Sequence, residues 1–167
     1  MKAYKFLLPD RVAPFTGFRW PVGEWAEADR QALCTAGIHA CDHGDLPFWL
    51  LDELWLIELG ESVVRGRHKL VAPNGRLVRR VEAWDAAAGE DFSAACIERV
   101  RGLAARRPDA AGHLADLAGW APHVRPAAVA SLAARAFEAF ESRKGYDDER
   151  AEQSAWLVGR LGLDAAA

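Results

Sequence analysis

Residues 33–43, which read LCTAGIHACDH, bring together more reactive side chains than any other part of the sequence. They hold two of the three cysteines and two of the five histidines. In an extended chain successive side chains point to opposite faces, so His39, Cys41 and His43 share one face. A histidine between apolar neighbours can transfer protons near neutral pH. We therefore expect His39 to be a general acid or base with Cys41 or His43 beside it; the alternative is a hydrogen-bonded core histidine.

The same side chains are of the types that bind zinc, and Cys34 or His68 could supply a further ligand. Zinc ligands usually flank a tight turn, whereas alternate residues of one strand lie about 6 to 7 Å apart. We therefore predict no metal and no cofactor. In the alternative interpretation Cys34 and Cys41 are small buried residues, and His43 lies in a turn.

Composition excludes several classes of protein. Of the 167 residues, 51% are hydrophobic and 27% are charged, which is typical of a globular protein. The net charge of −3 with no basic stripe argues against nucleic acid as a partner. An odd number of cysteines and the lack of an export signal favour a reducing cytoplasm. No apolar run approaches the ~20 residues that span a membrane. A homodimer is left open.

The composition changes near residues 85–90, and strand signals precede this point. We expect strands at 3–8, 18–27, 54–59, 62–64, 69–72 and 76–84. Asn74-Gly75 lies between the last two and predicts a hairpin that pairs residues 70–72 with residues 77–79. Asp45 as a cap and Pro47 in the first turn indicate a short helix over 45–50.

Helical spacing follows. The apolar residues predict one helix from Asp91 or Ser93 to Arg107, and a second over 114–120. A third begins near Pro126, and a last one over 151–161 follows the acidic cluster at 147–149, which suits a helix N-terminus. The fold class is α+β, with a mostly antiparallel sheet in the N-terminal half followed by three or four packed helices. A β-rich module (1–85) and a helical region (90–163) form one compact domain.

Tryptophan is unusually frequent, with seven in the chain and five before residue 85. These aromatic rings could wall a cavity or simply fill a small core. In the first case the ligand-binding residues are Tyr4, Trp20, Trp49, Trp55 and Trp84, with Trp25 nearby. The common nucleotide and hydrolase motifs G-x-S-x-G, the P-loop and G-x-G-x-x-G are absent from the sequence.

The order of four motifs resembles a family of bacterial and phage proteins with the pattern YKF…LCxxGFHAC…VELxG…IVRE. The motifs are residues 3–6, 33–41, 54–59 and 78–82, so the resemblance covers the first half. It implies an N-terminal α+β module and no catalytic assignment.

A weaker similarity links the chain to ADP-ribosyltransferase-like folds. There Tyr4-Lys5 would replace the usual Arg or His, and Glu58 or Glu82 would act as the catalytic acid.

Three functions remain open. The first is a small enzyme that acts on a metabolite through His39, with Glu58 or Glu82 as the orienting carboxylate, in a Trp-walled pocket. The second is a non-catalytic module, for ligand binding or resistance, whose aromatic cavity holds a small molecule. The third is an interaction adaptor whose helices present Trp120, Phe140 and Trp156 to a partner.

Overall fold

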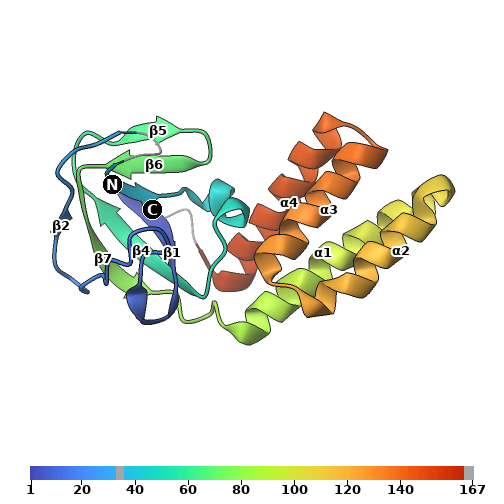
Figure 1. Ribbon diagram of the computed structural model, residues 1–167, viewed down its shortest axis with the longest axis horizontal. Helices are drawn as coiled ribbons and strands as arrows, with labels where there is room; N and C mark the ends of the chain where they lie inside the picture. Colours follow the sequence, from blue (N-terminus) through green and yellow to red (C-terminus); the bar gives the residue numbers. More distant parts are fainter. Residues whose placement is uncertain (33–35, 164–167) are drawn as a thin grey trace.

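The computed structural model describes residues 1–32 and 36–163, which form two lobes side by side (Figure 1). Within these residues the β lobe (residues 1–84) holds seven strands, and the helical lobe (residues 86–163) holds four α-helices. The predicted α+β class, with antiparallel sheets followed by helices, is confirmed.

The strands of the β lobe form two antiparallel sheets. They are β1 (Lys2–Leu7), β2 (Ala26–Glu27), β3 (Ile38–Ala40), β4 (Glu53–Leu59), β5 (Val64–Gly66), β6 (Lys69–Ala72) and β7 (Asn74–Arg80). The first sheet has the order β1-β4-β7-β2 and the second β3-β6-β5. Tyr4 and Cys41 exchange backbone hydrogen bonds of 2.8 and 2.9 Å, which join β1 to the segment after β3. The two sheets thus enclose a shared inner core.

Strand β4 is buried on both faces, which explains its nearly continuous apolar sequence. Trp55 and Ile57 point into the inner core between the sheets. Leu54 and Leu56 point the other way, into a second core shared with the helices. Because side chains alternate along a strand, a strand with a core on each side needs apolar residues at consecutive positions.

The predicted hairpin at Asn74-Gly75 is wrong. Asn74 is the first residue of β7, and Gly75 pairs with residues of β2 and β4. Strands β6 and β7 lie in different sheets, with Pro73 between them. Proline lacks the N–H that a ladder needs and suits a corner where the chain changes sheets. The tight hairpin joins β5 to β6 instead, with Arg67 and His68 at its tip.

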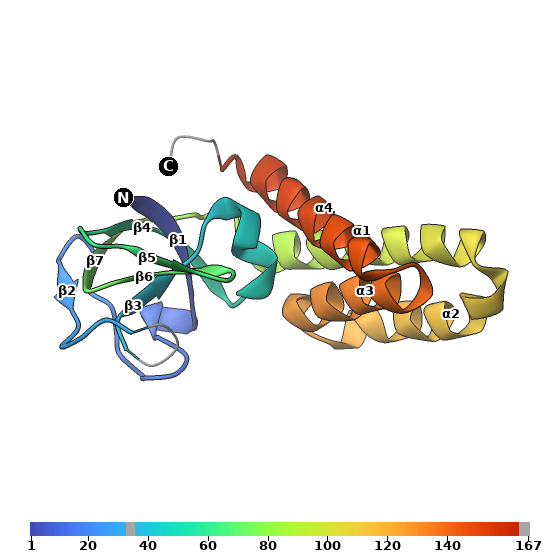
Figure 2. The ribbon, with the colours of Figure 1, turned by 90° about the horizontal axis from the view of Figure 1, so that it is seen from above.

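The helical lobe lies to one side of the β lobe (Figure 2). Its α-helices are α1 (Ala86–Arg106), α2 (Ala111–Trp120), α3 (Pro126–Phe140) and α4 (Arg143–Leu161). Four short 3-10 helices complete the described elements: η1 (Pro9–Arg11), η2 (His43–Phe48), η3 (Pro108–Ala110) and η4 (Ala121–His123). The helix predicted over 45–50 is thus the 3-10 helix η2.

Two helices begin earlier than the apolar spacing predicts, because each starts at a polar cap. The Asp85 carboxylate accepts a 2.8 Å hydrogen bond from the N–H of Ala88 at the start of α1. Ser142 accepts from the N–H of Gly145 at the start of α4. Such caps satisfy N–H groups that the helix leaves unpaired. The acidic cluster 147–149 therefore lies inside α4 and not before it.

A row of buried or half-buried aromatic rings joins the lobes. Phe6 of β1 contacts Trp84 edge to face at 5.7 Å between ring centres, and Trp84 contacts Phe92 of α1 at 6.4 Å. Phe92 in turn contacts Trp156 of α4 at 5.5 Å. Edge-to-face pairs at these separations are stabilising beyond the apolar area that they bury.

A buried polar network holds the helices together. Glu149 of α4 is 2% exposed and accepts two hydrogen bonds, of 2.8 and 2.9 Å, from the guanidinium of Arg99 on α1. Gln153 donates to Glu149 at 2.7 Å and to the carbonyl oxygen of Ala130 on α3 at 3.0 Å. The network therefore joins α1, α3 and α4 through one carboxylate.

Substitution of Glu149 by Ala should lower the free energy of unfolding by about 3 kcal/mol, because Arg99 and Gln153 lose their buried acceptor. Urea unfolding followed by circular dichroism measures the change. Glu98→Ala is the control, since Glu98 pairs with Arg101 at an exposed site and should cost less than about 1 kcal/mol. Equal losses in the two variants would contradict the prediction.

Candidate functional site

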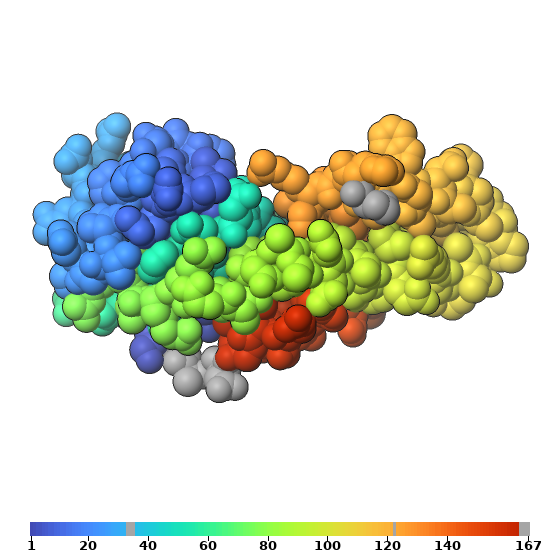
Figure 3. All heavy atoms as spheres, turned by 90° about the horizontal axis from the view of Figure 1, so that it is seen from below, coloured from blue at the N-terminus to red at the C-terminus, as the bar shows by residue number. Residues whose placement is uncertain are grey.

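A groove of about 1220 Å³ runs along α1 where the two lobes meet. It is lined by residues 50–52 before β4, by Trp84, Asp85 and one face of α1 as far as Arg101, and by the connection from α2 to α3. Figure 3 shows the hollow between the teal, green and orange segments. Ligand pockets for small molecules usually occupy about 300 to 1,000 Å³. The groove is therefore large enough for an organic ligand of ordinary size.

The walls of the groove are mostly apolar. At one wall, a Cβ atom on Gly89 of α1 would lie 3.1 Å from Pro126 Cγ, so glycine lets α1 approach the start of α3 closely. The Trp84 indole donates a 2.8 Å hydrogen bond to the carbonyl oxygen of Leu51, which fixes the segment before β4 against the residue that precedes the cap of α1. The larger apolar residues in the lining are Leu50, Leu51, Trp84, Ile97, Val124 and Pro126.

The charged residues of the lining are predominantly acidic. They are Asp52, Asp85, Glu90 and Glu98 against Arg101 and Arg125, so four negative charges face two positive ones and the balance is −2. Arg125 lies 4.0 Å from Asp52, and Arg101 lies 3.3 Å from Glu98. Asp85 caps α1, and Glu90 enters no ion pair within the described residues. Glu90 is thus the carboxylate most available to a ligand.

His39 and Cys41 do not line this groove. His39 lies on β3, where its Nδ1 is 3.1 Å from the carbonyl oxygen of Gly37. Its buried Nε2 has no hydrogen-bond partner in the described part of the chain. Burial, and then the ammonium of Lys5, lowers the pKa of His39. Cys41 is 2% exposed in the core shared with the helices, and burial raises the pKa of its thiol far above the ordinary range.

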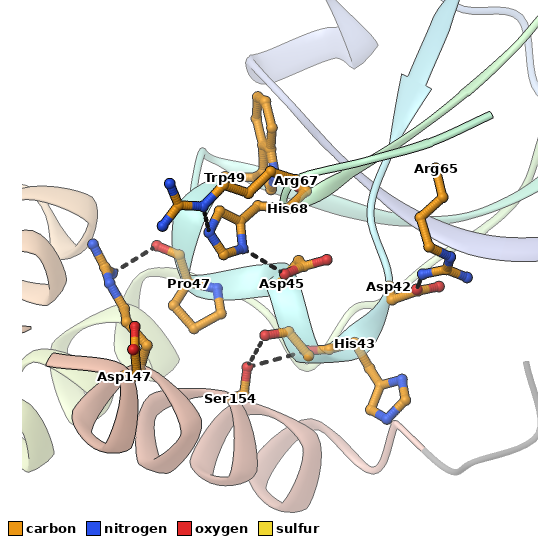
Figure 4. Close-up of polar contacts among 12 residues, drawn as sticks. Asp42, His43, Asp45, Pro47, Trp49, Arg65, Arg67, His68, Asp147 and Ser154 are labelled. Atoms are coloured by element: carbon orange, nitrogen blue, oxygen red, sulfur yellow. Dashed lines mark hydrogen bonds and ion pairs between the residues drawn. The ribbon is translucent and has the colours of Figure 1, made fainter. Parts of the chain in front are cut away.

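The other predicted catalytic residues lie apart from His39. His43 is exposed at the start of η2, and its ring points away from Asp45 in Figure 4. Glu58 on β4 pairs with Arg76 at 2.7 Å, and Glu82 is exposed after β7. The structure therefore does not bring His39, Glu58 and Glu82 into one pocket.

The predicted aromatic residues divide between the two cores. Trp20 and Trp55 are buried in the inner core, where the Trp55 indole donates to Glu53 at 2.9 Å. Tyr4 and Trp84 belong to the core shared with the helices, and Trp49 packs at its margin. Of the five predicted ligand-binding residues, Trp84 lines the groove.

The charged residues of the groove escaped prediction because they come from separate segments. Only on α1 is there a sequence signal. Glu90, Ala94, Glu98 and Arg101 are three or four residues apart, which places them on one face of a helix. A helix face that carries only small and charged residues is one that does not pack against the apolar core.

A second polar cluster lies where the β5–β6 hairpin meets η2 and α4 (Figure 4). His68 Nδ1 lies 2.9 Å from an Asp45 carboxylate oxygen, and the ring stacks on Phe48 at 3.7 Å between centres. Arg67 donates to His68 Nε2 at 3.2 Å. Nε2 is therefore an acceptor, and Nδ1 carries the hydrogen that Asp45 accepts. His68 has a φ of 59°, a backbone conformation that non-glycine residues rarely adopt.

Within residues 1–32 and 36–163, no three His, Cys, Asp or Glu side chains are grouped so that they could hold a metal ion. Cys34, considered above as a ligand, lies outside the described residues.

None of the helices in the described part of the chain combines the length and the apolar character needed to cross a bilayer. No protein-family model, no curated protein and no solved structure matches the sequence or the fold. The site must therefore be interpreted from its own geometry.

Lys5 on β1 is an unusual cation, because its side chain points into the inner core. Its Nζ donates a 2.6 Å hydrogen bond to the carbonyl oxygen of His39 and lies 5.0 Å from the centre of the Trp20 ring. Burial lowers the pKa of Lys5 to about 8, an effect that Cys41 partly opposes. Between pH 8 and pH 10.5 the unfolded chain holds a proton that the folded chain has lost, so the Lys5 contribution to stability rises with pH over this window.

Lys5→Met should therefore be more stable than the wild type at pH 7, by roughly 1 to 3 kcal/mol, and this advantage should shrink as the pH rises from 8 to 10. Urea unfolding of both proteins across this range measures the difference. Lys144→Met is the control, because it removes an exposed lysine of the same charge and should change little. A Lys5→Met variant that is less stable at pH 7 would show that the ammonium contributes net stability.

Proposed function

We propose that this protein is a non-catalytic module that binds a small amphipathic cation in the groove along α1. The single observation that carries the proposal is the combination of apolar walls with a lining in which carboxylates outnumber guanidinium groups four to two. Apolar walls with a few placed charged groups are the usual composition of a ligand site.

The two parts of the groove have different roles in this proposal. Leu50, Ile97 and Pro126 offer apolar contacts to the body of the ligand. Glu90 offers its carboxylate to the positive group, since no cation of the described chain neutralises it. An anionic ligand of the same shape would meet an excess of negative charge, so charge sets the preference.

The composition of the groove favours a ligand-binding function over the His39-centred enzyme that the sequence predicted. The predicted acid and base residues His39, Cys41 and His43 lie outside the lining, and within the described residues the lining contains no histidine or cysteine. Ser93, the hydroxyl in the lining, donates to the carbonyl oxygen of Gly89 at 2.9 Å within its own helix. Among the described residues, no nucleophile with an adjacent base faces the groove.

Two xanthene dyes of similar shape test the charge preference. We expect the cation pyronin Y to bind, and the anion fluorescein to bind about tenfold more weakly or not at all, in fluorescence polarisation titrations. Ala94 is exposed on α1 in the lining, so Ala94→Trp should fill the groove and weaken pyronin Y binding by about tenfold or more.

Matched variants distinguish binding in the groove from non-specific attraction by the net charge of the protein. Ala105→Trp places the same side chain on an exposed part of α1 outside the lining and should leave binding unchanged. Glu90→Gln should weaken binding about threefold, whereas Asp148→Asn, which changes the net charge equally on α4, should not. Equal binding by the two tryptophan variants, or a preference for fluorescein, would exclude the proposal.

The Asp45–His68 contact supports a second candidate, an enzyme whose general base is His68 and not His39. A carboxylate that accepts from Nδ1 orients the ring and leaves the lone pair on Nε2, as in hydrolytic sites. In the structure that lone pair accepts from Arg67, so a substrate would have to displace the guanidinium to use it. Both side chains are partly exposed, at 33% and 25%, so a substrate could reach them.

Hydrolysis of p-nitrophenyl acetate tests this candidate. If His68 acts as a general base, His68→Gln should lower the rate about 100-fold, and Asp45→Asn should lower it as well. His113→Gln, at an exposed position of α2, is the control. A wild-type rate no higher than that of His68→Gln would leave the Asp45–His68 pair with a structural role.

A further inference from the structure

The inner core of the β lobe contains two hydrogen-bond donors that the protein does not fully satisfy. The ammonium of Lys5 has three N–H donors, and one hydrogen bond, to the carbonyl oxygen of His39, is formed. Lys5 takes part in no ion pair among residues 1–32 and 36–163. The ammonium therefore lacks a negative partner in the described structure.

The second donor is the indole N–H of Trp20. Trp20 is 4% exposed, and its Nε1 has no hydrogen-bond partner in the described residues. The same ring lies 5.0 Å from Lys5 Nζ. A buried donor without an acceptor costs about 1 to 3 kcal/mol, so the Trp20 N–H is unfavourable unless a ligand pairs with it. The adjacent Lys5 ammonium has one acceptor, the His39 carbonyl oxygen, and donors to spare.

We propose that Lys5 and Trp20 form a binding site for a small carboxylate, one that accepts from Lys5 Nζ and from Trp20 Nε1. This site lies in the β lobe and is independent of the groove along α1. One ammonium matches the single negative charge of a carboxylate, and the indole N–H supplies a second donor to the same group.

The loop of residues 8–22 holds Trp20 against Lys5. Arg11 Nε donates to the carbonyl oxygen of Trp20 at 3.0 Å, and the Trp20 N–H donates to the carbonyl oxygen of Arg11 at 3.0 Å. These two bonds fix the backbone of Trp20 beside β1. Lys5 is only half-buried, so a small anion can approach from solvent.

None of the groups that face Lys5 in the described structure forms an ion pair with it. The nearby titratable groups are His39 on β3, the Cys41 thiol after β3, and Arg11 in the loop over Trp20. The pKa of His39 is lowered and that of Cys41 is raised, so both are neutral near pH 7, and Arg11 is a cation. Strand β4 places Trp55 opposite Lys5. Glu53, two residues earlier on the same face, accepts from the Trp55 indole and from the Asp10 N–H and lies 3.8 Å from Arg80.

Binding of a carboxylate must stabilise the ammonium and so raise the pKa of Lys5. The chain has only four lysines, so each can be followed separately. Succinimidyl propionate acylates the neutral amine, and mass spectrometry of peptides reports each lysine as a function of pH. In chloride, Lys5 should reach half of its maximal labelling rate near pH 8, far below exposed Lys144.

Replacement of chloride by acetate at constant ionic strength should raise this midpoint for Lys5 by about one pH unit and leave Lys144 unchanged. A Lys5 midpoint that is the same in acetate and chloride overturns the proposal. A midpoint equal to that of Lys144 also overturns it, because Lys5 would then be an ordinary exposed amine.

Two tryptophan variants test the role of the indole. Trp20→Phe keeps an aromatic ring over Lys5 but removes the N–H, so the acetate effect should fall to less than about half. Trp55→Phe removes a buried indole that donates to Glu53, and should leave the acetate effect unchanged. Circular dichroism confirms the fold of each variant. Equal acetate effects in both variants would show that Trp20 takes no part.

Discussion

The position of the two lobes depends on Arg150, a guanidinium buried between them. Arg150 of α4 is 8% exposed and donates to the carbonyl oxygen of Pro47 in η2 at 3.3 Å and to Gln153 at 3.0 Å. Its guanidinium also lies over the ring of Phe48 at 4.6 Å. A buried cation is stable only when acceptors and π faces replace its water. Because these partners come from both lobes, separation of η2 from α4 would remove the Pro47 carbonyl oxygen and the Phe48 ring from the guanidinium.

The groove along α1 follows from this constraint. With η2 fixed on α4, the segment before β4 is held beside the start of α1. Trp84 lines the groove there and donates a hydrogen bond to the carbonyl oxygen of Leu51. Ser154 of α4 adds a 2.6 Å hydrogen bond to the carbonyl oxygen of Gly44 at the same junction. A groove between two firmly joined lobes is preformed, so a ligand need not pay to order it.

The sequence predicted those features that depend on local pattern. Alternation placed Cys41 on the opposite face from Ile38 and Ala40, and the structure agrees, since these residues belong to different cores. Helical spacing predicted the positions of α2 and α3 to within a few residues, because the apolar residues of each helix begin close to its first turn. Asn74-Gly75 gave a wrong prediction of a hairpin. The dipeptide is a local turn signal, whereas the conformation of β7 is set by its pairing with β4, which is distant in the sequence.

The candidate sites could not be predicted, because each depends on contacts between distant segments. Trp20 meets Lys5 only after the loop of residues 8–22 folds back, and Asp52 meets Arg125 only when the lobes join. The segment richest in reactive residue types makes structural contacts: Cys41, just after β3, fills a core, and the His39 carbonyl oxygen accepts from Lys5. Reactive residue types in a short segment therefore indicate chemistry only when the fold leaves them an open face, and here the open faces belong to Glu90 and His68.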